Sequence, residues 1–313
     1  MKTALLCSGQ GSQYVGMLKD LANEYQYISE LINESDKIVG YSLSDIYFNG
    51  PIERLKETRY TQPAIFIHSL AAFKLIQNKI DFVATAGHSI GEYAALCIAG
   101  VLKFEDALKL VSLRGQLMFD AGETTKGTMF AIIGLQDEKV IQVCEELNAT
   151  SKENIVVPAN FNSPGQVVVS GSADFLRNNV ELFKQAGAKI VKELVVSGAF
   201  HSPLMMPAQK KLTEAINSTK FEDAKFPVYS NVYAKPLIKA DELRESLTKQ
   251  LTSPVKWTQL ITKMNSDGIT NFIELGPGQV LQGLVKRILD NIETSGIDKL
   301  EHLEIFNNKY GNK

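Results

Sequence analysis

The 313-residue sequence contains no hydrophobic run that approaches the ~18 apolar residues typical of a transmembrane helix, and its N-terminal apolar run is too short for a signal peptide. Its three cysteines are far apart and lie among apolar residues, which is typical of reduced packing residues and not of disulfides or metal ligands. The formal net charge is only −2, so nothing favours nucleic acid or a membrane surface as a partner. We therefore expect a cytoplasmic protein that binds no metal, no nucleic acid and no membrane.

Tandem repeats and low-complexity segments are also missing, and the chain instead alternates strands with helices. In the first part of the chain this alternation, which includes a helix beginning at Pro63, predicts a mostly parallel sheet with helices on both faces. From about residue 125 the order changes to β-α-β-β-α-β, which is typical of a ferredoxin-like domain. We expect this small domain, 125–194, to be inserted in a large α/β domain formed by 1–124 and 195–313.

Ser89 is the clearest candidate nucleophile. It is the central residue of the stretch Gly87–Gly91, which has the spacing Gly-x-Ser-x-Gly. An apolar run precedes this stretch, and a helical pattern of small residues follows it. This strand–turn–helix setting exposes a serine hydroxyl at the end of a sheet, so we predict that Ser89 attacks a carbonyl.

Histidine is scarce, which limits the choice of a base for Ser89 to four residues. His302 lies in a polar tail after the last expected helix, and His68 lies inside a helix, where a packing role is expected. His88 adjoins the nucleophile and is expected to shape its pocket. His201 remains, in a loop between a strand and a helix, and is the predicted base, with an ordinary loop histidine as the alternative. No acid between Ser89 and His201 has the setting of a triad carboxylate, so a backbone carbonyl or an amide is expected to orient the imidazole.

Arg114 is a charged residue in the apolar stripe of a helix that begins near Phe104. A buried guanidinium requires an anionic partner, because an unpaired buried charge is very unfavourable. One explanation is a structural salt bridge. The other is that the partner is the carboxylate of a substrate, which the planar fork of donors would bind in a bidentate manner.

The loop Gly9–Gln13, with the sequence GQGSQ, follows the first strand. Tyr14 occupies the place of the third glycine of a dinucleotide-binding loop, and no P-loop is present anywhere in the sequence. The simpler interpretation is a tight turn. The functional alternative is a backbone N–H for an oxyanion hole, with the amide of Ile90 as the other donor.

Taken together, these motifs resemble the malonyl-CoA:acyl carrier protein transacylases of bacterial fatty acid synthesis. The resemblance spans nearly the whole chain. The motifs that carry it occur in the family's order: GQGSQYVGM, TQPA, GHSIGEYAAL, LRGQLM, NFNSPGQVV, AFHSPLM, SPVKW and ELGPGQVL.

The resemblance implies an α/β-hydrolase-like large domain with a ferredoxin-like insertion. It implies transfer of a malonyl group from malonyl-CoA to the phosphopantetheine thiol of acyl carrier protein through a malonyl-serine ester. No bound cofactor is implied, since coenzyme A is a product, and a monomer is expected.

The resemblance also implies roles for individual residues. Ser89 matches the nucleophile, His201 the base and Arg114 the residue that pairs with the malonyl carboxylate. The backbone amides of Gln10 and Ile90 match the oxyanion hole.

Further positions match the surroundings of the site. The main-chain carbonyl of Gln250 matches the group that orients the histidine, which would account for the missing acid. Phe200 resembles the malonyl-selective form, because relatives that take methylmalonyl have a smaller residue there. Three more residues are expected to bind substrate: Gln62, Met118 and Asn160.

One position departs from the family pattern. The proline that usually precedes GQGSQ is Ser8 here, and we expect this change to loosen the loop slightly without removing a donor. Lys286 and Arg287 are candidate contacts for the carrier protein, and are equally well interpreted as a solvated helix face.

Three other functions remain open from the sequence. A discrete acyltransferase that serves a polyketide synthase would carry the same motifs. A serine esterase or thioesterase on the same scaffold is less consistent with Arg114 and with the missing acid. A non-catalytic scaffold that binds acyl carriers is less consistent with the presence of both Ser89 and His201.

Overall fold

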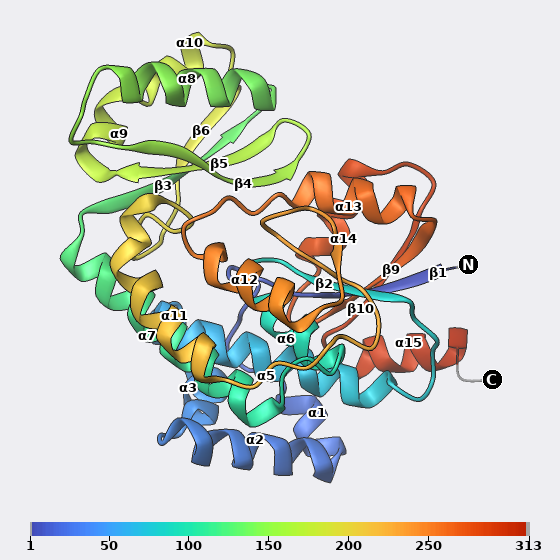
Figure 1. Ribbon diagram of the computed structural model, residues 1–313. Helices are drawn as coiled ribbons and strands as arrows, with labels where there is room; N and C mark the ends of the chain where they lie inside the picture. Colours follow the sequence, from blue (N-terminus) through green and yellow to red (C-terminus); the bar gives the residue numbers. More distant parts are fainter. Residues whose placement is uncertain (1, 311–313) are drawn as a thin grey trace.

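Two β-sheets organise the protein, in a computed structural model that describes residues 2–310 (Figure 1). The larger sheet has six strands in the order β10-β9-β1-β2-β7-β8, and all neighbours are parallel except β7 and β8. The prediction of a mostly parallel sheet is therefore confirmed. Its strands are β1 (Lys2–Cys7), β2 (Ala84–Gly87), β7 (Val228–Tyr229), β8 (Pro236–Leu237), β9 (Ile269–Leu275) and β10 (Glu293–Ile297).

Strand β1 shows why this sheet is covered on both faces. Leu5 and Cys7 pack into the core formed by α5 (Thr58–Ile76), α6 (Gly91–Ile98) and α7 (Phe104–Thr124). The alternate residues, Ala4 and Leu6, pack against α13 (Trp257–Ser266) and α14 (Val280–Ile288). Since successive side chains of a strand point to opposite faces, a continuous apolar run is buried between two helical layers.

The smaller sheet is antiparallel, with the strand order β4-β5-β3-β6. Its strands are β3 (Gly127–Ile133), β4 (Val156–Ser163), β5 (Gln166–Ser172) and β6 (Ile190–Glu193). One face packs in a separate core against α8 (Asp137–Ala149), α9 (Ala173–Asn179) and α10 (Glu181–Gln185) (Figure 1). The opposite face turns toward the large sheet, and its side chains Met129 and Val168 join the main core.

The segment around Val255 connects the two sheets at one point. The Phe161 amide donates to the Val255 carbonyl at 2.9 Å, and the Val255 amide donates to the Ala159 carbonyl at 2.8 Å. The chain after α12 (Ala240–Gln250) therefore lies along β4 as an additional extended segment. These two hydrogen bonds fix the small sheet over the end of the large one, where the candidate site lies.

The remaining helices surround these layers, and none of the helices in the described part of the chain is long and apolar enough to cross a bilayer. They are α1 (Lys19–Glu24), α2 (Gln26–Val39), α3 (Leu43–Asn49), α4 (Ile52–Leu55), the short 3₁₀ helix η1 (Pro203–Met205), α11 (Met206–Ser218) and α15 (Leu300–Tyr310).

Two details of the sequence prediction were wrong. Pro63 does not begin its helix: α5 begins at Thr58, and Pro63 lies in its interior. Burial of most of this helix outweighs the one backbone hydrogen bond that proline removes. His302 does not lie in a tail, because it belongs to α15, whose Leu303 and Phe306 pack into the main core.

Candidate active site

Ser89 occupies the turn between β2 and α6, with its backbone at a φ of 52°. The flanking glycines allow this turn. A Cβ atom on Gly87 would lie 2.0 Å from the carbonyl carbon of Gly91, and one on Gly91 would lie 2.2 Å from the carbonyl oxygen of Cys7. Close packing of strand, turn and helix thus explains the spacing Gly-x-Ser-x-Gly. Asn231 braces the turn, since its Oδ1 accepts from the Ser89 amide at 2.7 Å and its Nδ2 donates to the Gly87 carbonyl at 2.8 Å.

His201 lies next to Ser89, with 2.8 Å between its Nε2 and the Ser89 Oγ. Its other ring nitrogen, Nδ1, donates to the backbone carbonyl of Gln250 at 3.0 Å. This carbonyl fixes the tautomer that leaves Nε2 free to accept a proton. Burial, followed by the nearby Arg114 cation, lowers the pKa of His201 to about 3. The imidazole is therefore neutral at physiological pH.

Arg114 extends from α7 to the same point and is 1% exposed. Its Nη2 donates to the Ser89 Oγ at 3.1 Å and to the Gln250 Oε1 at 3.0 Å, and its Nη1 donates to the Gln62 Oε1 at 2.7 Å. Its Nε has no partner. Among residues 2–310 no carboxylate forms an ion pair with this guanidinium, so its hydrogen-bond acceptors in the structure are neutral oxygens.

The Gln250 side chain and Glu92 were not singled out from the sequence in this role. The Gln250 Nε2 donates to the Ser89 carbonyl at 3.0 Å and to the Glu92 Oε2 at 2.5 Å. Glu92 is 2% exposed, and burial raises its pKa to about 7. Its position in the otherwise apolar helix sequence GEYAALCI was the signal that could have identified it. Together these contacts orient the Gln250 amide so that its oxygen faces Arg114.

The glycine loop, residues 8–14, lies beside the nucleophile turn. A Cβ atom on Gly9 would be 2.9 Å from the His88 carbonyl oxygen, so the two backbones are in close contact. Neither the Gln10 amide nor the Ile90 amide donates a hydrogen bond within the described chain. Ser8 donates from its amide to the Leu275 carbonyl at 3.1 Å, which argues against the expected loosening of the loop.

A cavity of about 160 Å³ opens beside Ser89, between the two sheets. Six of the predicted site residues line it: Gln10, Ser89, Met118, Asn160, Phe200 and His201. His88 lines it as expected, held by Asn162 Oδ1 at 2.8 Å from its Nε2. Met129 and Val168 of the small sheet contribute an apolar wall.

The other four predicted residues do not line the cavity and lie behind Ser89. Arg114 contacts Ser89, Gln62 and Gln250, and Ile90 precedes α6. The structure therefore brings all ten predicted site residues into one region, in two layers. No group of three or more potential metal ligands occurs within residues 2–310.

Comparison with known proteins identifies the family. Residues 4–302 match the model of the acyl transferase domain family. The malonyl CoA-acyl carrier protein transacylase of Haemophilus influenzae is 41% identical over 300 residues, which is 95% of each chain. The crystal structure of an acyl carrier protein S-malonyltransferase from Vibrio cholerae superimposes with a TM-score of 0.93, at 40% identity, and covers 98% of this chain and 100% of that one.

A malonyl-transacylase solved in complex with a type II polyketide synthase acyl-carrier protein also has a TM-score of 0.93, at 37% identity over 100% of both chains. The likeness in sequence and in structure covers nearly the full chain in every case. The chain belongs to the malonyl CoA-acyl carrier protein transacylases, within the acyl transferase domain family.

Proposed function

We propose that the chain transfers a malonyl group from malonyl-CoA to the phosphopantetheine thiol of acyl carrier protein, through an ester on Ser89. One observation carries this proposal: the Ser89 Oγ lies 2.8 Å from the His201 Nε2 and 3.1 Å from the Arg114 Nη2. A nucleophile, a neutral base and an unpaired buried cation thus meet at one oxygen atom. Acyl transfer uses the first two, and a dicarboxylic acyl group such as malonyl uses the third.

In the first half-reaction His201 takes the proton of Ser89 as the serine attacks the thioester carbonyl. The low pKa of His201 ensures that it is unprotonated in the empty site. Arrival of the malonyl carboxylate beside Arg114 offsets the cation that contributes to this low pKa. Substrate binding therefore raises the proton affinity of His201 when it must accept a proton.

The tetrahedral oxyanion would be bound by the backbone amides of Gln10 and Ile90, which have no acceptor within the described chain. Removal of one oxyanion donor typically costs about 10²- to 10³-fold in rate. After collapse of the intermediate, coenzyme A departs with the proton from His201, and malonyl-Ser89 remains.

In the second half-reaction His201 deprotonates the thiol of the carrier arm, which attacks the serine ester. The ester bond to Ser89 breaks, the Ser89 Oγ takes the proton back from His201, and malonyl-carrier protein departs. The imidazolium that forms in each half-reaction is stabilised by the Gln250 carbonyl at 3.0 Å from Nδ1. A backbone carbonyl thus takes the orienting role that a carboxylate has in a triad.

Arg114 would select the acyl group. The malonyl carboxylate replaces the Ser89 Oγ as the acceptor of its Nη2, which frees the hydroxyl for attack. An esterase for neutral acyl groups gains nothing from a desolvated cation at this point. Met118, Asn160 and Phe200 line the cavity that receives the acyl chain, and Gln62 holds the guanidinium from the other side.

A polyketide synthase carrier is the second candidate partner. It is favoured by the structural relative that was solved with a type II polyketide synthase acyl-carrier protein, and whose whole chain this protein matches. Both reactions use the same malonyl-serine intermediate and differ only in the carrier.

We also infer the finer division of the fold. The strand order β4-β5-β3-β6 and the two helical crossovers support a ferredoxin-like domain over 125–194. The nucleophile turn after β2 supports an α/β-hydrolase-like domain formed by 1–124 and 195–313. The proposed reaction requires no bound cofactor, and a cytoplasmic location remains a prediction from the sequence.

Intact-protein mass spectrometry after separate exposure to malonyl-CoA and acetyl-CoA tests the proposal. We expect a malonyl adduct on the wild-type protein, mapped to the peptide that contains Ser89, and none on Ser89→Ala. Addition of fatty-acid carrier or polyketide carrier to the loaded protein then shows which one removes the adduct. An adduct that persists in Ser89→Ala, or free malonate as the main product in the presence of both carriers, would refute the proposal.

A further inference from the structure

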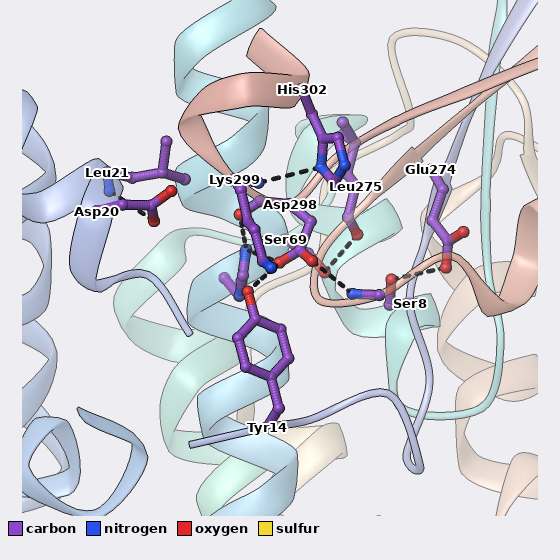
Figure 2. A network of polar contacts seen from close by, with 12 residues as sticks. Ser8, Tyr14, Asp20, Leu21, Ser69, Glu274, Leu275, Asp298, Lys299 and His302 are labelled. Carbon is purple, nitrogen blue, oxygen red and sulfur yellow. Dashed lines mark hydrogen bonds and ion pairs between the residues drawn. The ribbon is translucent and has the colours of Figure 1, made fainter. Parts of the chain in front are cut away.

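Both ends of the glycine loop (residues 8–14) are held by a buried polar network that the proposed chemistry does not use (Figure 2). Its other members come from α5, from the end of β9 and the turn after it, and from the segment between β10 and α15. Segments more than 250 residues apart in sequence thus meet at a loop that lies against the nucleophile turn.

Asp298 holds the C-terminal end of the loop. Its Oδ1 accepts from the Tyr14 hydroxyl at 2.8 Å, and its Oδ2 accepts from the Gly278 amide at 3.0 Å. The His68 Nε2 lies 2.9 Å from the Asp298 carbonyl oxygen and 3.3 Å from its Oδ1. Asp298 is 4% exposed and His68 is fully buried, while Tyr14 is partly buried, so the Asp298 carboxylate is largely shielded from water.

Ser8 holds the N-terminal end. Its amide donates to the Leu275 carbonyl at 3.1 Å, and its hydroxyl donates to the Glu274 Oε1 at 3.0 Å. Ser69 of α5 donates to the same Leu275 carbonyl at 2.9 Å. Proline at position 8 would have neither of these donors, so this chain compensates for its departure from the family pattern with two hydrogen bonds.

The segment between the two anchors contacts the catalytic turn directly. Gly9 is packed against the His88 carbonyl, and Gln10 lines the cavity beside Ser89. The Ser12 hydroxyl closes the loop on itself by donating to the Gly9 carbonyl at 2.8 Å. An oxyanion donor contributes only if its N–H points at the oxygen within a few tenths of an ångström, so the position of this loop bears directly on rate.

We propose that Tyr14 and Asp298 are positioning residues that hold the Gln10 amide in line with the Ser89 oxyanion. The inference rests on the proposed function, because it assumes that the Gln10 amide binds the oxyanion. The inference adds a role for the Tyr14–Asp298 hydrogen bond. Asp298 lies between β10 and α15 and does not contact Ser89.

Tyr14→Phe is the sharpest test, because it removes one hydroxyl from a partly buried side chain and leaves the ring in place. Tyr229→Phe is a matched control: Tyr229 also donates to a carboxylate, the Asp267 Oδ2 at 2.6 Å, and lies in a different core cluster from the loop. Asp298→Asn is the second variant.

Two measurements are made on each protein. The first is the rate of CoA release in the first turnover, per active site titrated by malonyl loading. In Tyr14→Phe and Asp298→Asn we expect a roughly tenfold lower rate at saturating malonyl-CoA, with half-saturation unchanged, since oxyanion binding acts only in the transition state. The second is hydrogen exchange of the amides of residues 9–13, which we expect to become faster in both variants and to stay unchanged in Tyr229→Phe.

The outcomes separate this inference from the proposed function. If the wild-type protein loads malonyl and Tyr14→Phe loads it at the wild-type rate per titrated site, the positioning role is wrong and the function stands. The positioning role is also wrong if Tyr14→Phe lowers only the amount of folded protein and leaves the rate per titrated site unchanged. If the wild-type protein does not load malonyl, the proposed function fails, and unchanged exchange of the loop in both variants then overturns the anchoring as well.

Discussion

Replacing Arg114 with alanine should convert a malonyl-selective site into one that scarcely distinguishes malonyl-CoA from acetyl-CoA. In the structure the guanidinium is 1% exposed, and residues 2–310 offer it three neutral oxygens but no ion pair. The nearest carboxyl group, that of Glu92, is reached only through the Gln250 amide, so a ligand carboxylate would be the first to pair directly with this cation. The alanine variant removes this attraction and leaves the malonyl carboxylate in a cavity whose lining residues include no arginine or lysine.

The size of the effect follows from the contacts. A bidentate pair forms two charge-assisted hydrogen bonds, each of about 1.5–3 kcal/mol, so the loss is roughly 3–6 kcal/mol. At 1.36 kcal/mol per factor of ten, kcat/KM for malonyl-CoA should fall by about 10²- to 10⁴-fold. For acetyl-CoA, which has no carboxylate, the change should stay within about tenfold, from disturbed packing around Gln62 and Gln250.

The assay is single-turnover CoA release with each thioester, normalised to folded protein, for the wild type, Arg114→Ala and Arg114→Lys. Lysine keeps the charge but loses the planar fork, so an intermediate malonyl rate is expected. Arg177→Ala, on the exposed side of α9, is a control for the loss of an arginine in general. Equal losses with malonyl-CoA and acetyl-CoA in Arg114→Ala would refute the reasoning and would make Arg114 a structural residue.

Three further predictions concern the groups around Ser89. Because the pKa of His201 lies near 3, its neutral form persists in acid, so kcat/KM for the first half-reaction should be flat from about pH 5 to 8; an inflection near 6.5, the ordinary histidine value, would contradict this. Burial raises the pKa of Glu92 from 4.5 to about 7, so the stability that its protonated form contributes is complete below about pH 4.5 and is lost as the pH rises through 7. The free energy of unfolding in urea, Glu92→Gln minus wild type, should therefore increase by up to about 3 kcal/mol from pH 5 to pH 8. An equal difference at the two pH values would exclude this account. Phe200→Ala should raise the ratio of methylmalonyl to malonyl loading by enlarging the cavity, as measured by mass spectrometry with both thioesters, and an unchanged ratio would show that Phe200 does not limit the acyl group.

Local patterns were sufficient to single out the two residues that are proposed to react. Ser89 was predicted from the spacing of its flanking glycines. Gly87 and Gly91 are required there because the backbone packs too closely for a Cβ atom. His201 followed by elimination among four histidines. Arg114 was identified because a charge in an apolar stripe conflicts with its surroundings. Such local conflicts in a sequence often mark functional positions.

The supporting residues could not be predicted in the same way. Glu92 contacts Gln250 across 158 positions and Asn231 contacts Ser89 across 142, so only the folded chain brings them together. Strand β10, with the sequence ETSGI, lies at the edge of the sheet and lacks a clear apolar pattern. The start of α5 was also missed, since burial of the helix outweighed the local preference of Pro63.

Ser89 and His201 share one more property: both are non-glycine residues in the left-handed region, with φ values of 52° and 55°. Each carries a conformational penalty of roughly 1–2 kcal/mol that glycine would not have. At these two positions the stability of the folded chain and the rate of the proposed reaction therefore favour different residues. Glycine at either position would relieve this penalty and would also remove a side chain on which the proposed reaction depends.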